Sequence, residues 1–149
     1  MLKNLYHLII ALIILVVVLT LWGLWNRGEE QKEIPSSHQL ITVSSHQEGG
    51  LIGNPLIVKG EARGNWYFEA TFPIVLTDWD GRIIAQSYAE AHGEWMTTEF
   101  VPFEGKLEFE EPEDSGDFSD WGHLIFQKAN ASGLAEHDDA YEIRVRFRE

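Results

Sequence analysis

Apolar residues fill the amino-terminal end of the chain without interruption. No Asp, Glu, Lys or Arg lies between Lys3 and Arg27, and residues 8–19 (LIIALIILVVVL) are all aliphatic. At about 1.5 Å of rise per residue, a helix between these two basic residues is ~34 Å long, enough to cross a ~30 Å hydrocarbon core. A helix packed on a protein core would be amphipathic, whereas this run is apolar on all sides. The pattern therefore predicts one transmembrane helix over residues 1–27.

The flanks of this helix predict a permanent anchor rather than a cleaved signal peptide. The apolar run is longer than that of a typical secretory signal, and no small-x-small cleavage site follows Leu19. Tyr6, Trp22 and Trp25 stand near its ends, where amphipathic rings favour the membrane–water interface. The numbers of basic residues on the two sides of the helix are nearly equal. However, the amino-terminal side is only a few residues long, and the remainder of the chain has the strand pattern of an exported β domain. We therefore expect a cytoplasmic amino terminus and an extracytoplasmic carboxy-terminal domain.

Beyond the helix, the pattern changes from an apolar run to short alternations. Residues 28–39 are polar without an apolar period and are expected to form a juxtamembrane linker. From residue 40, short apolar runs alternate with turn signals, which indicates β-strands. The predicted strands span residues 40–44, 56–62, 66–77, 82–89, 100–109, 123–128 and 141–147.

The longest predicted strand, residues 66–77, has the clearest period of two. Trp66 leads it and is the expected core tryptophan, while Pro73 indicates an edge position or a bulge because it cannot donate to a ladder. The dipeptide Asp80-Gly81 then predicts a tight turn into the next strand. The face expected to be buried carries Phe68, Ala70, Phe72, Ile74 and Leu76.

The number and spacing of the strands predict an all-β domain over residues 40–149. About seven short strands, with turns every ~8–12 residues and no long amphipathic helix, are typical of an antiparallel β-sandwich. A small barrel is the alternative. The chain has no cysteine, so its core lacks disulfides, thiol chemistry is excluded, and the anchor is not a lipoprotein cysteine.

Charge narrows the class of partner. Ten Lys and Arg residues and all 24 Asp and Glu residues lie beyond residue 25, so this part carries a net charge of about −14 with histidine neutral. Nucleic acids and anionic lipid headgroups require positive charge, so we expect no nucleic-acid partner. A cationic partner is compatible with this composition.

Signatures of catalysis are missing from the sequence. It contains neither G-x-S-x-G nor H-E-x-x-H, and its six histidines are scattered. The acidic stretch at residues 110–120 holds carboxylates for several calcium ligands but lacks the spacing of an EF-hand loop. We expect a protein that is not an enzyme and carries no cofactor, with calcium binding as an alternative.

Tryptophans near the predicted turns are the candidate surface recognition residues. Aromatic rings at loop tips stack on sugars or fill a partner's pocket. Trp79 stands between two aspartates in a turn and is the best candidate for exposure. A role in binding cell-wall glycan is therefore a second alternative. The candidates are Trp79, Trp95 and Trp121.

Several of these segments together resemble a known family. Residues 55–62 (PLIVKGEA), 68–72 (FEATF) and 76–81 (LTDWDG) are similar, in order and spacing, to strands of the immunoglobulin-like domain of bacterial spore germination. The similarity extends over residues 40–148. It implies an immunoglobulin-like β-sandwich in the bacterial cell envelope, acting as a binding or scaffolding module without catalytic residues. We therefore expect a membrane-anchored, non-catalytic domain whose partner is an envelope protein or a cell-wall component.

Overall fold

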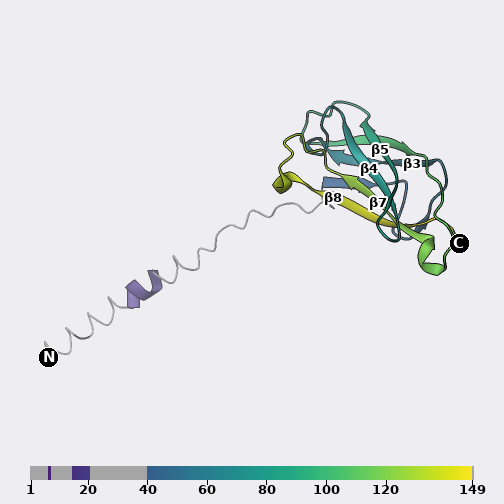
Figure 1. Cartoon of the computed structure of the whole chain (residues 1–149). Coiled ribbons are helices and arrows are strands. Elements are labelled where there is room, and N and C mark those ends of the chain that lie inside the picture. Colours follow the sequence, from purple (N-terminus) through teal and green to yellow (C-terminus); the bar gives the residue numbers. More distant parts are fainter. Residues whose placement is uncertain (1–6, 8–14, 21–39, 149) are drawn as a thin grey trace. The chain divides into compact units, whose positions relative to one another are not determined.

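The computed structural model describes His7, residues 15–20 and residues 40–148 (Figure 1). The chain divides into two units, Met1–Ile34 and Pro35–Glu149. His7 and residues 15–20 are helical. Among the described residues, no helix is both long enough and apolar enough to cross a membrane. The rest of the predicted anchor at 1–27, and the whole predicted linker at 28–39, lie outside the described residues.

Over residues 40–148 the structure is all-β. Eight strands form one sheet in the order β1-β3-β6-β5-β4-β7-β8-β2. Short 3-10 helices lie between some of the strands: η1 (Gly64–Trp66), η2 (Asp117–Asp120) and η3 (Ala135–His137). The strands are β1 (Ile41–Val43), β2 (Gly50–Leu51), β3 (Leu56–Arg63), β4 (Thr71–Asp78), β5 (Ile83–Ala91), β6 (Phe100–Leu107), β7 (Trp121–Gln127) and β8 (Ala140–Arg146).

The expectation of about seven strands, all antiparallel, is wrong in one place. β2 lies between the predicted strands at residues 40–44 and 56–62, where no strand is predicted, and it pairs in parallel with β8 through Gly50↔Val145. The N–H groups of Gly49 and Ile52 donate to the carbonyls of Arg144 and Arg146 on the outer edge of β8. Backbone N–H and C=O groups at an open sheet edge need hydrogen-bond partners, and a neighbouring segment can supply them. The glycine-rich segment beside β8 therefore forms a short strand.

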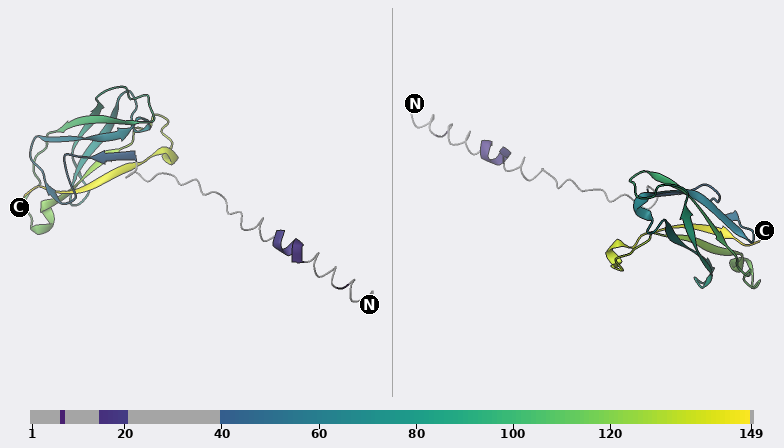
Figure 2. Two further views of the ribbon diagram at one scale, coloured as in Figure 1. Left: turned by 180° about the vertical axis from the view of Figure 1, so that it is seen from behind. Right: turned by 90° about the horizontal axis from the view of Figure 1, so that it is seen from above.

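The sheet curls into two layers that enclose the core (Figure 2). Strands β1, β3 and β6 form one layer, and β4, β7, β8 and β2 form the other. Rings meet between the layers: the Phe103 ring centroid on β6 lies 5.0 Å from that of Phe72 on β4 and 6.0 Å from that of Phe126 on β7. β6 is a sheet neighbour of neither strand. These contacts show a sandwich-like packing of one continuous sheet.

β5 joins the two layers. It pairs with β4 over nearly its whole length, but with β6 only from Ala89↔Gly105 to Ala91↔Phe103. At Gly105 an added Cβ would lie 2.7 Å from Ile74 Cδ1 and 3.2 Å from Ala89 Cα. A larger residue at this position would displace the end of Ile74 and crowd Ala89, so the glycine eases the close approach of β6 to β5.

The predicted long strand at residues 66–77 begins later than expected. Trp66 is buried as predicted, but it lies in η1, and β4 starts only at Thr71. Phe72, Ile74 and Leu76 are all buried. The assignment of Phe68 and Ala70 to the buried face is wrong. Phe68 is 48% exposed because the chain reverses sharply between Phe68 and Thr71, whose backbones exchange two hydrogen bonds.

The edge position predicted from Pro73 holds locally, although its strand is an interior one. β4 lies between β5 and β7 in the sheet. The ladder between β4 and β7 begins at Ile74↔Phe126, one residue beyond Pro73. The missing N–H of the proline therefore falls outside that ladder, which explains how an interior strand tolerates it.

The turn between Phe68 and Thr71 is strained, and this predicts a stabilising substitution. Glu69 and Ala70 have φ angles of 51° and 62°, in the left-handed region that disfavours side chains with a Cβ. We expect Ala70→Gly to raise the free energy of unfolding by about 0.5–1 kcal/mol, measured by urea denaturation. Ala85→Gly, within β5, is the matched control and should lower it by a similar amount. Destabilisation by Ala70→Gly would contradict the left-handed backbone.

The turn between β4 and β5 is held by a buried carboxylate. Asp78 is 2% exposed. Its side chain accepts hydrogen bonds from the backbone N–H groups of Asp80 and Arg82, at 3.0 and 2.9 Å, and from Arg82 Nε at 3.0 Å. Gly81, with φ of 78°, completes the turn predicted from Asp80-Gly81. This network fixes the loop that presents Trp79.

Loss of the Asp78 charge should loosen this turn. Asp78→Asn keeps the shape of the side chain but replaces an ionised acceptor by a weaker one. We expect the free energy of unfolding to fall by about 2 kcal/mol, measured by chemical denaturation. Asp80→Asn, on the exposed side of the same turn, should change it by less than about 0.5 kcal/mol. Equal effects of the two substitutions would show that the network does not hold the turn.

Candidate functional site

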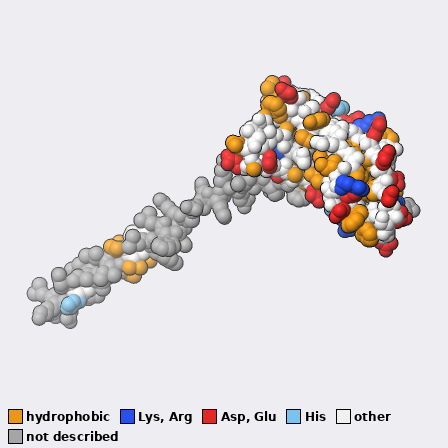
Figure 3. Space-filling view, in the orientation of Figure 1, with side chains coloured by type: hydrophobic (Ala, Val, Ile, Leu, Met, Phe, Trp, Pro, Cys, Tyr) orange, Lys and Arg blue, Asp and Glu red, His pale blue; other side chains and the backbone are white. Residues whose placement is uncertain are grey.

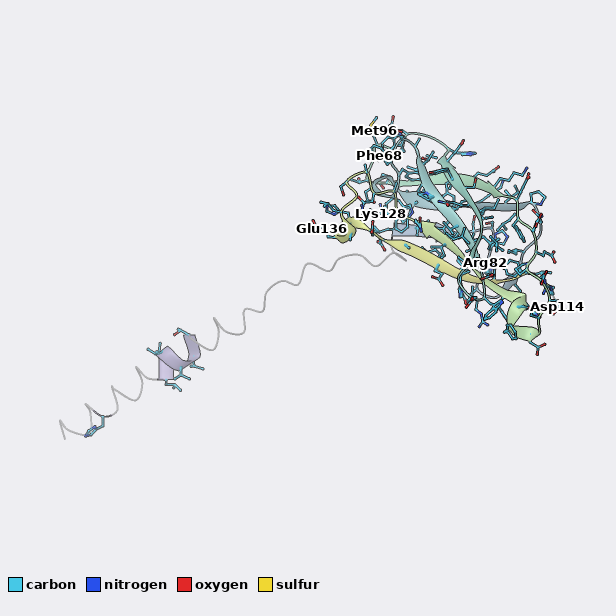
Figure 4. The ribbon with its side chains drawn as sticks, in the orientation of Figure 1. Phe68, Arg82, Met96, Asp114, Lys128 and Glu136 are labelled. Carbon is cyan, nitrogen blue, oxygen red and sulfur yellow. The ribbon has the colours of Figure 1, made fainter. Side chains whose placement is uncertain are left out.

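A hollow lies at the end of the sandwich formed by the β4–β5 turn. It is an open cavity of about 1200 Å³, and we call it the acidic cleft. One wall is the turn and the start of β5, from Asp78 to Ile84. The opposite wall is the segment that follows β6, residues 108–113, with Asn54 and Pro55 just before β3. Figure 4 shows Arg82 and Asp114 at this end, away from Met96 and Phe68.

Carboxylates dominate the lining of the cleft. Asp78 is neutralised by Arg82, and Glu108 forms an ion pair with Lys106 at 2.5 Å. The hydrogen bond from Lys106, followed by its positive charge, lowers the pKa of Glu108. Among the described residues, no cation pairs with the other lining acids, so the cleft carries uncompensated negative charge. These acids are Asp80, Glu110, Glu111 and Glu113. Figure 3 shows Asp and Glu side chains spread over the surface of the sandwich, with Lys and Arg side chains among them.

An exposed aromatic pair lies beside the acids. Trp79 and Phe118 have ring centroids 4.7 Å apart with planes at 70°, the edge-to-face geometry that aromatic pairs favour. Their side chains are nonetheless 48% and 52% exposed. Trp79 comes from the β4–β5 turn and Phe118 from η2, so the pair connects two loops. Its exposed faces offer apolar area next to the acids.

Side chains hold both walls of the cleft in place. Asn54 donates through its amide nitrogen to the Phe109 carbonyl at 2.5 Å and accepts from the Phe109 N–H at 3.3 Å. Arg148 donates to Asp120 at 3.2 Å and to the Pro112 carbonyl, which ties the acidic segment to the end of β8. Together with the Asp78 network, these bonds shape the cleft before any ligand arrives.

The three candidate tryptophans occupy different environments. Trp121 begins β7 at the same end as the cleft, but the Arg144 and Arg146 guanidinium carbons lie 3.8 and 5.1 Å from its ring centroid. Trp95 follows β5 at the opposite end and packs partly against the core. Of the three, only Trp79 lines the cleft. Sequence reasoning missed Phe118, since only the contact with Trp79 distinguishes it from other loop aromatics.

The acidic segment does not arrange its carboxylates around a point. Over the described part of the chain, no group of three or more His, Cys, Asp or Glu side chains is placed to hold a metal ion. The histidines that pair with acids do so singly, as His123 with Glu142 at 3.5 Å. What the cleft offers is spread negative charge beside aromatic rings.

Comparison with known proteins assigns the family. Neither a curated protein nor a solved structure matches the chain. The family model described as the immunoglobulin-like domain of bacterial spore germination matches residues 40–119, more than half of the chain. The matched region includes β1 to β6 and the β4–β5 turn, and it contains every residue that lines the cleft. The chain therefore belongs to the immunoglobulin-like domain family of bacterial spore germination.

Proposed function

We propose that the protein is a non-catalytic binding module of the bacterial cell envelope whose acidic cleft binds a cationic segment of a partner protein. Membership of a family that is not known to be catalytic supports the non-catalytic part. The single observation that carries the binding site is the cleft itself, where unpaired carboxylates lie beside the exposed Trp79–Phe118 pair.

Electrostatics and aromatic chemistry favour the same ligand. The whole chain has a formal net charge of −13, so its surface attracts cations over a distance and repels acidic partners. Lys and Arg side chains pair with carboxylates and also stack on aromatic faces. A basic polypeptide segment satisfies both kinds of group in this cleft at once.

The amino-terminal segment supports attachment to a membrane. Its uncharged run between Lys3 and Arg27 is the reason to propose an anchor there, with the sandwich outside the cytoplasm. The register Ile41↔Ala62 places the start of β1 beside the end of β3. The cleft lies at the start of β3, beside Pro55, so the start of β1 and the cleft are at opposite ends of β3.

Trp79 also favours a second candidate function. A half-exposed indole in a cleft can stack on a sugar ring, and the domain is proposed to lie near the cell wall. A glycan ligand would depend on Trp79 but little on the acids. The two functions are therefore separable by the same set of variants.

Binding of a Lys- and Arg-rich peptide, measured by isothermal titration calorimetry, tests the proposed site. We expect Trp79→Ala, and separately the triple variant Glu110→Gln, Glu111→Gln and Glu113→Gln, to weaken binding about tenfold, or ~1.4 kcal/mol. Phe68→Ala removes an aromatic ring of equal exposure from the other end of the domain and should leave the affinity unchanged. If the peptide does not bind the wild-type protein, the proposal fails.

Salt dependence distinguishes the two candidate ligands. Peptide affinity should fall steeply as salt rises from low to physiological concentration, because the attraction is between exposed charges. The triple variant should show a shallower salt dependence. Affinity for purified peptidoglycan that exceeds the affinity for the peptide, is unaffected by salt and is lost in Trp79→Ala would instead establish the glycan function.

A further inference from the structure

Over residues 83–88, one edge of β5 has no neighbouring strand. The ladder from β5 to β6 ends at Ala89↔Gly105, whereas the ladder from β5 to β4 continues to Ile83. From Ile83 to Tyr88, β5 is therefore an edge strand, paired with β4 on one side only. Residues 83–89 (IIAQSYA) carry no charge and no proline. Charges and prolines are the usual means of protecting a sheet edge, so this edge is left open to pairing.

The free backbone groups on this edge follow from the hydrogen-bond pattern. Ala91 N–H donates to Ala70 on the β4 side at 2.8 Å, and the next residue, His92, donates to Pro102 on the β6 side at 2.7 Å. Successive residues of a strand point their backbone groups to alternate sides. Gln86 therefore turns its N–H and C=O away from β4, to the side where β6 has already diverged. Its side chain is exposed as well.

The acidic cleft lies in the gap that this divergence opens. Arg82 and Ile84, at the start of β5, line one wall, and Glu108 and Phe109, just after β6, line the other. A chain laid along the outer edge of β5 would enter this space. Its side chains would alternate between the partly exposed Ile84 and the acids at residues 110–113.

We propose that the cationic segment binds as an added β-strand along the outer edge of β5, with its backbone hydrogen-bonded to Gln86 and alternate basic side chains in the acidic cleft. This inference rests on the proposed function and specifies how the partner binds. Strand addition takes affinity from main-chain hydrogen bonds and specificity from alternate side chains. The preferred ligand is then an extended segment in which basic and apolar residues alternate.

Charge selects this occupant over a second copy of the chain. Pairing of two β5 edges would bring two acidic clefts together in molecules that each carry a net charge of −13. Like charges brought together in this way oppose association. A basic segment, in contrast, is attracted to the acidic cleft.

A pair of peptides and a pair of variants test the added strand. The peptides are an alternating Lys-Val peptide and a block peptide with the same composition. Gln86→Pro deletes the outward N–H but spares the ladder to β4, where an edge strand tolerates proline. Gln86→Ala is the matched control, because it loses the side chain and keeps the N–H. Calorimetry on the full chain gives the affinities, and hydrogen exchange gives the protection of the Gln86 amide.

The alternating peptide should bind more tightly than the block peptide and slow exchange of the Gln86 amide. Gln86→Pro should weaken its binding about fivefold or more, and Gln86→Ala should bind like the wild type. Thermal unfolding of Gln86→Pro checks that the variant folds. If it does not fold, the exchange measurement on the wild-type protein still tests the added strand.

Three outcomes decide between this inference and the proposed function. Tight, acid-dependent binding of both peptides with equal affinity, or with an unprotected Gln86 amide, would overturn the added strand and leave the cationic site in place. Absence of binding by either peptide to the wild-type protein would overturn both. Protection of the Gln86 amide without any effect of the Glu110, Glu111 and Glu113 substitutions would instead retain the strand and remove the acidic site.

Discussion

The rest of the structure depends on the short contact where β5 meets β6. Only three residue pairs, from Ala89↔Gly105 to Ala91↔Phe103, join the two layers into one sheet. Gly105 eases this contact, because a Cβ there would displace the end of Ile74 and lie tightly against Ala89. Once β5 has crossed, β6 diverges from it, and the layers close over a shared aromatic core around Phe103. The cleft is the gap that this divergence leaves at one end.

An opening between two layers would collapse or fluctuate unless its walls were held. Asp78 holds one wall through bonds to the backbone and guanidinium of Arg82, and Asn54 holds the other through both backbone groups of Phe109. Both side chains satisfy backbone groups that would otherwise lack partners at the end of a sheet. The other acids that line the cleft, at residues 80, 110, 111 and 113, take part in none of these bonds and would be available to a ligand. Under the proposed function, stability and recognition would thus use different carboxylates of the same acidic surface.

The tryptophans of the sandwich show how context divides one residue type among several roles. Trp66 is buried in the core, and Trp121 is covered by the guanidinium groups of Arg144 and Arg146. Trp95 packs partly on the core at the far end, and Trp79 stands half exposed against Phe118. A ring whose face is already covered by a guanidinium group or by core side chains has little exposed surface left for contact with a partner. Trp79 keeps its exposed face because Asp78 turns the chain outward beneath it.

The sequence by itself determined the all-β class, most strand positions, the Asp80-Gly81 turn and the family, because these follow from local alternation, turn chemistry and a characteristic order of short motifs. It also identified Trp66 as a core residue and Trp79 as the best candidate for exposure. Tertiary structure decided what depends on distant segments. The parallel pairing of β2 arose from the open edge of β8, and the reversal at Glu69 and Ala70 turned Phe68 outward against its own alternation. Phe118 beside Trp79, the arginines over Trp121 and the cleft between β5 and β6 each require segments far apart in sequence to meet, which no local pattern records.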